Sequence, residues 1–361
     1  MGHYFFNETV TIGFNAMSQW VSEIMQGAGM LKEDADLVAD TLVVADARGV
    51  YSHGCLRVPL YVERIEKKAV NPKAKPELIT ECGALALVDG NNAAGQVVSY
   101  FAMQKTIELA EKFGIAFVTA RNSNHNGAAA YYSMMASAKN MIGICMSIGG
   151  GNLMAPYGGA ERRIGNNPLS VALPAMNREP VVLDMAQSVV AKGKIMMARK
   201  THSLIPAEWA LDSDGMPTTD PFAATEGFLR TMGDYKGSGL SVVIGMLSSM
   251  VSQAAIGPSL LDVYEDFRPL NKGHTFIAIK YDALVDPETF RENMDEQISF
   301  IKDAKKAKGV SEIYLPGEME SITYAKQSRN GIVMAGEVIS ELVRLSEKFG
   351  VDIPSQDIKN N

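Results

Sequence analysis

The stretch Ile115–Ser147, IAFVTARNSNHNGAAAYYSMMASAKNMIGICMS, decides the fold class of this 361-residue chain. Its apolar start, residues 115–120, is typical of a buried strand, and residues 128–139 and 141–147 have the patterns of a helix and a second strand. The asparagine-rich loop 122–127 lies between the first strand and the helix. This order predicts an α/β fold whose polar loops follow the strand ends, where ligand-binding groups collect.

The flanking sequence extends this pattern in both directions. Helices are expected at about residues 14–28, 33–48, 55–67, 96–113, 188–199, 240–253, 287–301 and 318–348. Strands are expected near residues 77–80, 84–89, 169–173, 181–184 and 272–280, and residues 202–222 are expected to form a long ordered loop. The first 75 residues are therefore mainly helical, and the middle of the chain is mixed α/β.

Composition argues against several classes of protein. The 34 basic and 41 acidic residues give a net charge of −7, which disfavours nucleic acid or an anionic membrane as the main partner. The cysteines, Cys55, Cys82 and Cys145, share no short spacing, which fits a reducing compartment better than a disulfide framework. No apolar run is long enough to cross a bilayer, and the start MGHYFFNETV lacks a signal-peptide layout. We therefore expect a cytoplasmic protein.

Residues 45–65, ADARGVYSHGCLRVPLYVERI, place four polar side chains within ten residues: Ser52, His53, Arg57 and Tyr61. Arg57 and Tyr61 are four apart, so they share one face of the expected helix, and His53 precedes it. An imidazole moves a proton, and a guanidinium binds a carboxylate through two hydrogen bonds. These side chains predict a site for a small hydroxy or keto acid.

His125 supplies a second imidazole, in a loop whose small neighbours leave room for a substrate. Two structural alternatives stay open from these residues alone. A loop histidine is more often structural than catalytic, and Arg57 also fits a surface ion pair with Glu63 or Asp46. The histidines without such polar company, His202 and His274, are expected to be structural or exposed.

A nucleotide site of the Rossmann type is absent, because IGGGNLM at 148–154 breaks the G-x-G-x-x-G pattern. The better phosphate candidate is GDYKGSG at 233–239, where backbone N–H groups, a helix N-terminus and Lys236 favour an anion. Its glycines equally fit close helix packing. Asp184, at a strand end, fits hydrogen bonding to a ribose or capping of the following helix. Neither metal-ligand spacing nor a serine-nucleophile motif is found.

Taken together, eight segments resemble the malate/L-lactate dehydrogenase family that is unrelated to the Rossmann-fold enzymes of the same names. They run in order through about residues 15–345: ADARGVYSHGCLRVPLYVERI, NSNHNGAAAYYSMMA, APYGG, GNNPLSVALP, LDMAQSVVAKGKI, GMPTTDP, GDYKGSGL and PGE. Ureidoglycolate dehydrogenase, sulfolactate dehydrogenase and diketogulonate reductase belong to that family. The resemblance implies a family-specific, non-Rossmann NAD(P)-binding fold with a helical N-terminal region, and homodimers that share the active site.

The resemblance also implies roles for residues of this chain. His125 and His53 are the expected catalytic imidazoles, with His125 as the base, and Ser52, Arg57 and Tyr61 are expected to hold the substrate. Cofactor contacts are expected at Asp184, Met185, Ala186, Lys236, Gly237, Gly317 and Glu318, with Asn166 and Asn167 nearby. The chain departs from the family at 165–168, where its G-T-N-P motif is GNNP, and in the glycine-rich segment after Ser147.

The function implied is hydride transfer between NAD or NADP and C2 of a 2-hydroxy or 2-oxo acid of the malate, L-lactate or ureidoglycolate type. Residues 1–75 and 285–361 are expected to form a helical, dimer-associated region, and residues 76–284 an α/β NAD(P)-binding domain with the active-site loops. Two alternatives remain, namely a cyclic imino acid reductase of the same family and a catalytically silent binding protein with the same fold.

Overall fold

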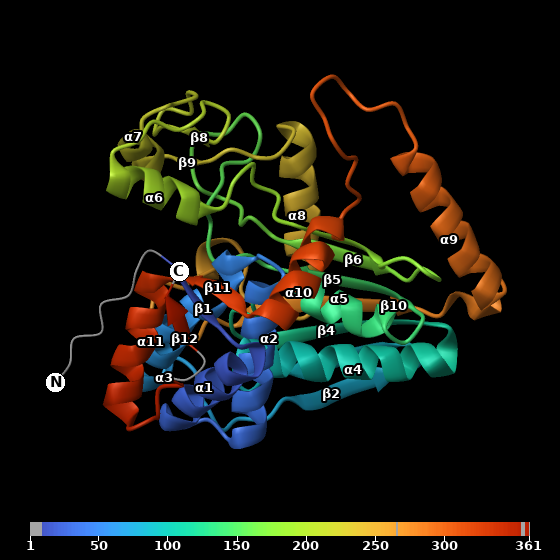
Figure 1. The fold of residues 1–361 in the computed structure, drawn as a ribbon, viewed down its shortest axis with the longest axis horizontal. Coiled ribbons are helices and arrows are strands. Elements are labelled where there is room, and N and C mark those ends of the chain that lie inside the picture. The colour runs from blue at the N-terminus through green and yellow to red at the C-terminus, as the bar shows by residue number, and fades with distance from the viewer. Residues whose placement is uncertain (1–8, 265, 355–357, 361) are drawn as a thin grey trace.

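The computed structural model describes residues 9–264, 266–354 and 358–360, and it has the mixed α/β fold expected from the sequence (Figure 1). The helices are α1 (Phe14–Gly27), α2 (Lys32–Ala47), α3 (Val58–Glu66), α4 (Gly95–Phe113), α5 (Ala129–Ser137), α6 (Lys192–Thr201), α7 (Pro221–Glu226), α8 (Tyr235–Ser249), α9 (Pro287–Lys302), α10 (Glu318–Asn330) and α11 (Gly336–Phe349). The strands are β1 (Thr9–Ile12), β2 (Glu77–Cys82), β3 (Leu85–Asp89), β4 (Ile115–Ser123), β5 (Ile142–Ser147), β6 (Leu169–Leu173), β7 (Val181–Met185), β8 (Ala210–Leu211), β9 (Phe228–Leu229), β10 (Lys272–Ile279), β11 (Ile332–Ala335) and β12 (Ile358–Asn360).

A seven-stranded sheet with the order β2-β3-β4-β10-β5-β6-β7 forms the centre of the fold. Strands β3 and β4 pair in parallel, and the other neighbours pair antiparallel. A Rossmann sheet is mostly parallel, so the expected non-Rossmann fold is confirmed. These pairings also make β4, β5 and β7 run in the same direction. The loops that follow those three strands therefore lie at the same end of the strands.

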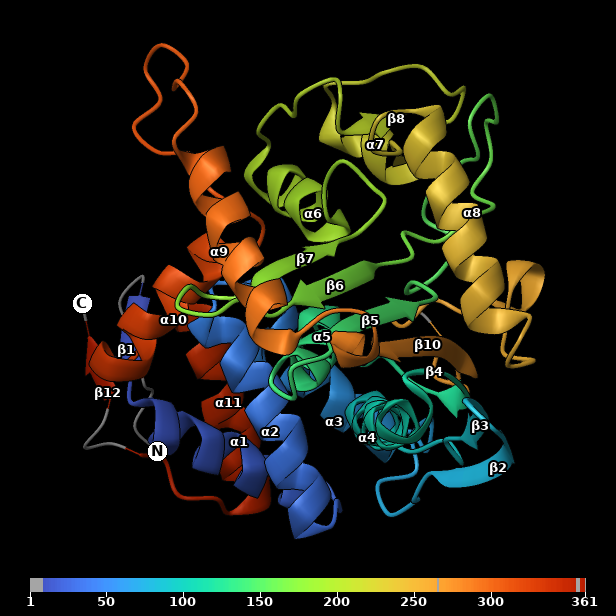
Figure 2. The same cartoon turned by 90° about the vertical axis from the view of Figure 1, so that its right-hand side faces the viewer.

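Helices cover both faces of this sheet (Figure 2): α4 and α5 pack on one face, and α8 covers part of the other. On the first face, Phe276 and Ala278 of β10 are buried with Val118 of β4. On the second face, the hydroxyl of Thr275 donates to the carbonyl of Leu247 in α8 at 3.1 Å. Because the side chains of β10 alternate between two covered faces, this central strand is largely buried on both sides.

A second core joins the two ends of the chain. It contains residues of α1, α2, α3 and α11 and of the paired strands β1 and β11. Trp20 of α1 is buried there, and its indole N–H donates to the hydroxyl of Ser346 in α11 at 2.6 Å. Burying segments so distant in sequence against each other stabilises the helical region. Its division from the sheet as a separate domain stays a prediction.

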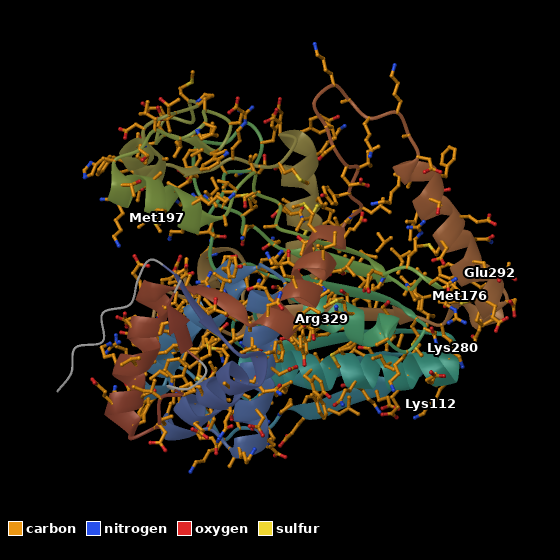
Figure 3. All side chains as sticks on the ribbon, in the orientation of Figure 1. Lys112, Met176, Met197, Lys280, Glu292 and Arg329 are labelled. Carbon is orange, nitrogen blue, oxygen red and sulfur yellow. The ribbon has the colours of Figure 1, made fainter. Side chains whose placement is uncertain are left out.

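Two further groups of elements lie beyond the sheet. Helices α6 and α7 and the hairpin β8-β9 surround a small core that includes Met154 and Ile195, and Met197 lies on α6 in this lobe (Figure 3). Helix α9 extends from the opposite side and is anchored by Asp295, which accepts from the backbone N–H groups of Met176 and Asn177 at 3.1 and 2.8 Å.

Some of the predicted element boundaries are wrong. The expected single helix over 318–348 is broken, because Gly331 adopts φ +93° and residues 332–335 pair with β1 as strand β11. The helix expected from residue 188 begins at Lys192, and the helix expected from residue 240 begins at Tyr235. The loop expected over 202–222 contains the short strand β8, and β4 runs three residues further than expected.

Candidate active site

The segment between α2 and α3 is folded against a buried carboxyl group. Asp46, near the end of α2, is fully buried and accepts from the backbone N–H of Cys55 at 2.7 Å. Gly54 lies so close that a Cβ there would stand 1.8 Å from the Asp46 carboxyl oxygen. Burial raises the pKa of Asp46 to about 7. The carboxyl therefore fixes the backbone of the segment that carries Ser52, His53 and Arg57.

The Arg57 guanidinium faces the site without a carboxylate partner among the described residues. Its Nε donates to the carbonyl of Ser52 at 2.7 Å, and its Cζ lies 5.2 Å from the centre of the Tyr264 ring. Glu63, one alternative partner, pairs with Lys67 instead. The remaining N–H donors of Arg57 are consequently available to a ligand, and its stacking on an aromatic ring fits the preference of guanidinium groups for such surfaces.

The two predicted imidazoles lie together although 72 residues separate them in the sequence. The rings of His53 and His125 are stacked, with centres 5.7 Å apart and planes 21° from parallel. The Ser52 hydroxyl is 2.9 Å from Nδ1 of His53, and the Tyr61 hydroxyl is 2.7 Å from Nδ1 of His125. The structure thus brings all five predicted substrate-side residues into one site.

Burial and positive charge keep both imidazoles neutral. They lower the pKa of His53 to about 4, through burial first and the Arg57 charge second. The same causes, in the same order, hold the pKa of His125 well below its ordinary value. Burial raises the pKa of the Tyr61 phenol to about 12. At neutral pH the site therefore offers uncharged imidazoles beside a permanent cation, and both rings have a nitrogen lone pair for a hydrogen bond.

The loop that carries His125 is held by buried amides. Asn124 donates from its side chain to the carbonyl of Ala93 at 2.8 Å, and Asn126 donates to the hydroxyl of Ser99 at 3.0 Å. The N-terminus of α4 presses against this loop, so that a Cβ on Gly95 would lie 2.3 Å from the Asn124 carbonyl oxygen. The asparagines that flank His125 are therefore structural supports that aim the imidazole.

Strand β10 supplies two buried polar residues that the sequence analysis did not select. His274 contacts the hydroxyl of Ser147 through Nδ1 at 2.6 Å and the carbonyl of Asn124 through Nε2 at 3.2 Å, so it supports the His125 loop from below. Lys272, 1% exposed, donates to the carbonyls of Gly149 and Leu261. Burial lowers the pKa of Lys272 to about 7. The only feature of the sequence that could have indicated the burial of Lys272 and His274 was their place in the alternating pattern of β10. His202, by contrast, is exposed at the end of α6.

The predicted cofactor residues lie around the end of β7. Asp184 accepts from the backbone N–H of Ala130 at 2.8 Å, which caps α5 and ties β7 to the helix that follows the His125 loop. Pro316 accepts from Val182 of the same strand at 3.0 Å, which places the PGE turn beside it. On its other side, the segment after β7 pairs with the segment before α8, because Gln187 accepts from Met232 at 2.8 Å.

The end of β7 combines a close backbone turn with buried polar atoms that lack partners in the described ranges. Gly317 adopts φ +82°, and a Cβ there would lie 2.8 Å from Val182, so the backbone turns closely against the strand. Directly after Ala186, the buried Gln187 Oε1 and Ser188 Oγ have no hydrogen-bond partner within the described ranges. Buried polar atoms usually have partners. Both residues, which the sequence analysis did not select, fit contacts to a nicotinamide cofactor.

Several of the expected cofactor residues already have partners within the described part of the protein. The backbone N–H groups of Lys236, Gly237 and Ser238 all donate to nearby carbonyls, so an anion at the start of α8 would be held by the Lys236 side chain and the helix dipole alone. The Asn167 amide is used within the protein, accepting from Gly149 and donating to Ser241. Glu318 forms an ion pair with Lys302. Met185 ends β7, Ala186 follows it, and the Asn166 carbonyl accepts from the backbone N–H of Gln187 at 2.8 Å.

Other kinds of site are not found in the described part of the chain. No group of three or more histidine, cysteine or acidic side chains there is arranged to hold a metal ion. Within the same ranges, no helix has both the length and the apolar character needed to cross a membrane. Cys55 and Cys145 are buried free thiols, and Cys82 is an exposed one.

Two stacked imidazoles, a tyrosine hydroxyl and the Arg57 guanidinium therefore lie in one site, and the hydrogen bond from Ala130 to Asp184 links the His125 loop to the end of β7. A family model described as malate/L-lactate dehydrogenase matches residues 12–343. The chain therefore belongs to the malate/L-lactate dehydrogenase family, as its sequence motifs predicted.

Individual relatives agree with this assignment. The L-sulfolactate dehydrogenase of Methanocaldococcus jannaschii is 35% identical over 92% of this chain and 95% of that protein. The malate dehydrogenase of Pyrococcus abyssi is 36% identical over 95% of this chain and 96% of that protein, and the ureidoglycolate dehydrogenase (NAD(+)) of Escherichia coli K12 is 34% identical over 92% and 95%. The crystal structure of malate dehydrogenase from Entamoeba histolytica superimposes with a TM-score of 0.91 at 30% identity, over 96% of this chain and 99% of that one.

Proposed function

We propose that this protein is an NAD(P)-dependent dehydrogenase that transfers a hydride between the nicotinamide and C2 of a 2-hydroxy or 2-oxo acid. The observation that carries the proposal is the hydrogen bond of 2.7 Å between Tyr61 and His125. It forms beside the stacked His53 and beside Arg57, which has no carboxylate partner among the described residues. A proton-transfer group and a carboxylate clamp in one site are what oxidation of a 2-hydroxy acid requires.

Each side chain then has a defined task. Arg57 binds the substrate carboxylate through its free N–H donors and so orients the C2–H bond. His125 removes the proton of the C2 hydroxyl as the carbonyl forms, and returns it in the reductive direction. Ser52 and His53 complete the wall of the substrate site. The cofactor, when bound, accepts or supplies the hydride at C2.

The cofactor half follows the strand end of β7. Asp184, Met185 and Ala186 are proposed to line the nicotinamide riboside, with Gly317 and Glu318 on one side and Lys236 and Gly237 on the other. Asn166 contacts the cofactor from the neighbouring loop, and Asn167 positions that loop. The helix cap between Asp184 and Ala130 supports this arrangement, because it links the cofactor strand to the His125 loop.

Several finer points belong to the same proposal. The substrate is an acid of the malate, L-lactate or ureidoglycolate type, by likeness to relatives named for malate and ureidoglycolate. The likeness to the relative named as NAD(+)-dependent favours NAD over NADP. We also propose a cytoplasmic homodimer, in which residues 1–75 and 285–361 form the dimer-associated region and residues 76–284 the NAD(P)-binding domain.

The direct test is a panel of 2-hydroxy acids incubated with the protein and either NAD or NADP, with formation of reduced nicotinamide followed by absorbance. We expect turnover of at least one acid of the proposed types. A cyclic imine consumed with NADPH, without oxidation of any hydroxy acid, would establish the imino acid reductase instead. Cofactor binding without turnover of either class would establish a silent binding protein.

A further inference from the structure

A small cavity lies beside Tyr61 and His125. Its volume is about 20 Å³, which is enough for one water molecule and little more. Its walls are mainly apolar, with contributions from α1, α2 and α3. The polar side chains that line it are Tyr61, Arg64, Gln96, Asn124 and His125.

Three of these side chains have a buried polar atom that lacks a partner among the residues the structure describes: Arg64 Nε, Gln96 Nε2 and Asn124 Oδ1. The three residues are 2%, 1% and 3% exposed. Leaving such an atom unpaired costs about 1–3 kcal/mol. A single water molecule accepts two hydrogen bonds and donates two, so it can pair with Arg64 Nε and Asn124 Oδ1 and still accept one from the Tyr61 hydroxyl.

Two of these side chains are otherwise fixed in place. Arg64 donates through its terminal nitrogens to the carbonyls of Val263, Asp266 and Arg268, at 3.0, 2.6 and 2.9 Å. The Asn124 amide nitrogen donates to Ala93, so its oxygen points elsewhere. These contacts hold the Arg64 and Asn124 side chains in place, so Nε of Arg64 and Oδ1 of Asn124 cannot reach other partners by rotation.

Gln96 connects the cavity to the catalytic pair. Its amide is close enough to the Tyr61 oxygen to oppose the burial-driven rise in the pKa of that phenol. Its Nε2 would also lie 3.9 Å from a Cβ on Gly127, two residues after His125. The amide therefore lies between the phenol and the histidine loop.

The direction of one hydrogen bond decides how His125 works. If the Tyr61 hydroxyl donates to Nδ1 of His125, the neutral imidazole carries its proton on Nε2 and has no lone pair for the substrate. If Tyr61 donates elsewhere, its oxygen accepts the Nδ1 proton, and the Nε2 lone pair faces the substrate hydroxyl. The backbone N–H of Gly127 also points at Nδ1, but at 3.4 Å this contact is weak.

We propose that the cavity holds one bound water molecule, which accepts hydrogen bonds from Arg64 Nε and from the Tyr61 hydroxyl and donates one to Asn124 Oδ1. The Gln96 amide donates to the Tyr61 oxygen, and together these contacts keep His125 in the tautomer that is protonated on Nδ1. Gln96 is thereby a positioning residue, because it acts on the substrate only through Tyr61 and His125. The inference rests on the proposed function for its effect on turnover, while the tautomer and the water are properties of the folded protein.

The first experiment needs no variant and no substrate. Nitrogen-15 NMR of the histidine-labelled protein reports the tautomer, with the His125 signals identified by their loss in His125→Asn. A high-resolution crystal structure reports density in the cavity. We expect the Nδ1-protonated tautomer and one ordered water. An Nε2-protonated His125, or a cavity without density for a water, overturns the proposal, and both results are readable even if no substrate is ever turned over.

The second experiment is Gln96→Leu, which keeps the side-chain volume and removes the amide. We expect kcat to fall by about tenfold to a hundredfold, as for other outer hydrogen-bond partners of catalytic groups, with a shift of His125 toward the other tautomer and unchanged nicotinamide affinity. Gln104→Leu, on the exposed side of the same helix, is the matched control and should change none of these. A fall in kcat without a tautomer change, or no change in either, overturns the role of Gln96. If Gln96→Leu does not fold, the wild-type tautomer and density decide.

Discussion

The two halves of the candidate site are built in different ways. The substrate half consists of side chains that contact each other, as in the Tyr61–His125 hydrogen bond and the stacked His53 ring. The cofactor half consists mainly of backbone around the end of β7, with Gly317 turned closely against Val182. The difference teaches that the proposed proton transfer and substrate binding depend on particular side chains, whereas the proposed dinucleotide site depends on the backbone conformation around β7. Substitutions in the substrate half should therefore lower kcat or raise KM, whereas substitutions in the cofactor half should change stability and nicotinamide binding.

Removing the base is the strongest test of this contrast. In His125→Ala we expect kcat for the hydroxy acid to fall by about 10²- to 10⁴-fold, because the hydroxyl proton loses its acceptor. Cofactor affinity, measured by nicotinamide fluorescence, should stay near the wild-type value, because the residues around the end of β7 are unchanged. Turnover close to that of the wild type would remove His125 from the mechanism.

A second prediction concerns Asp46, the buried carboxyl group that contacts the segment carrying Ser52, His53 and Arg57. It tests whether the stability of the fold depends on the protonated form of this carboxyl. Its pKa is raised from 3.8 to about 7 in the folded protein, so between these values the folded chain holds a proton that the unfolded chain has lost. The free energy of unfolding should therefore decrease as pH rises from about 4 to about 7, by up to about 4 kcal/mol from this group.

Asp46→Asn removes this titration and should flatten the decline, as measured by urea unfolding at about pH 4.5 and about pH 8. The exposed Asp214→Asn is the control and should leave the decline unchanged. The same decline in Asp46→Asn as in the wild type would show that this carboxyl does not titrate as proposed.

Local sequence patterns were sufficient to predict most of the helices and strands. They were insufficient for strands that form only by pairing with a distant part of the chain. The strand, loop and helix over 115–137 were predictable because apolar periodicity and glycine stops act within a short window. Strand β11 was not, since residues 332–335 become a strand only by pairing with β1, more than 300 residues earlier. The bend at Gly331 makes that pairing possible, but a single glycine in the sequence does not predict such a bend.

The candidate site divides in the same way. Arg57 and Tyr61 were predictable as a pair because helical spacing places them on one face. Their meeting with His125 followed from family resemblance and not from spacing. Gln96, Arg64 and His274 were missed, because each acts on residues about 30 to 200 positions away that only the folded chain brings near. Gln187 and Ser188 were missed because an unpaired buried atom is invisible in a sequence.

Gly317→Ala tests the backbone character of the cofactor half. A Cβ at φ +82° is strained and would lie 2.8 Å from Val182, so we expect a stability loss of about 1–3 kcal/mol and weaker nicotinamide binding. Gly309→Ala is a close control, because Gly309 has φ +83° with nothing within 4 Å of a Cβ. Equal losses in the two variants, measured by urea unfolding and cofactor titration, would show that the contact with β7 is unimportant.

Arg57→Lys keeps the charge of the substrate clamp and removes its planar fork. We expect the KM for the acid to rise by about tenfold, with a smaller change in kcat, because a lysine cannot form the bidentate contact. Arg199→Lys is a suitable control, since Arg199 also stacks on an aromatic ring, that of Phe222, on α6. An unchanged KM in Arg57→Lys would refute bidentate capture.

The smallest effect is expected at Lys236, the exposed cation in the first turn of α8. The nearby N–H groups are already used, so only this side chain and the helix dipole attract the cofactor pyrophosphate. Lys236→Ala should weaken NAD and NADP binding equally, by about twofold to fivefold, with a smaller dependence on salt than in the wild type. Lys200→Ala on α6 is the control. A loss confined to NADP would instead place Lys236 beside the ribose phosphate, and the cofactor half would then contain a side chain that selects its ligand, as the substrate half does.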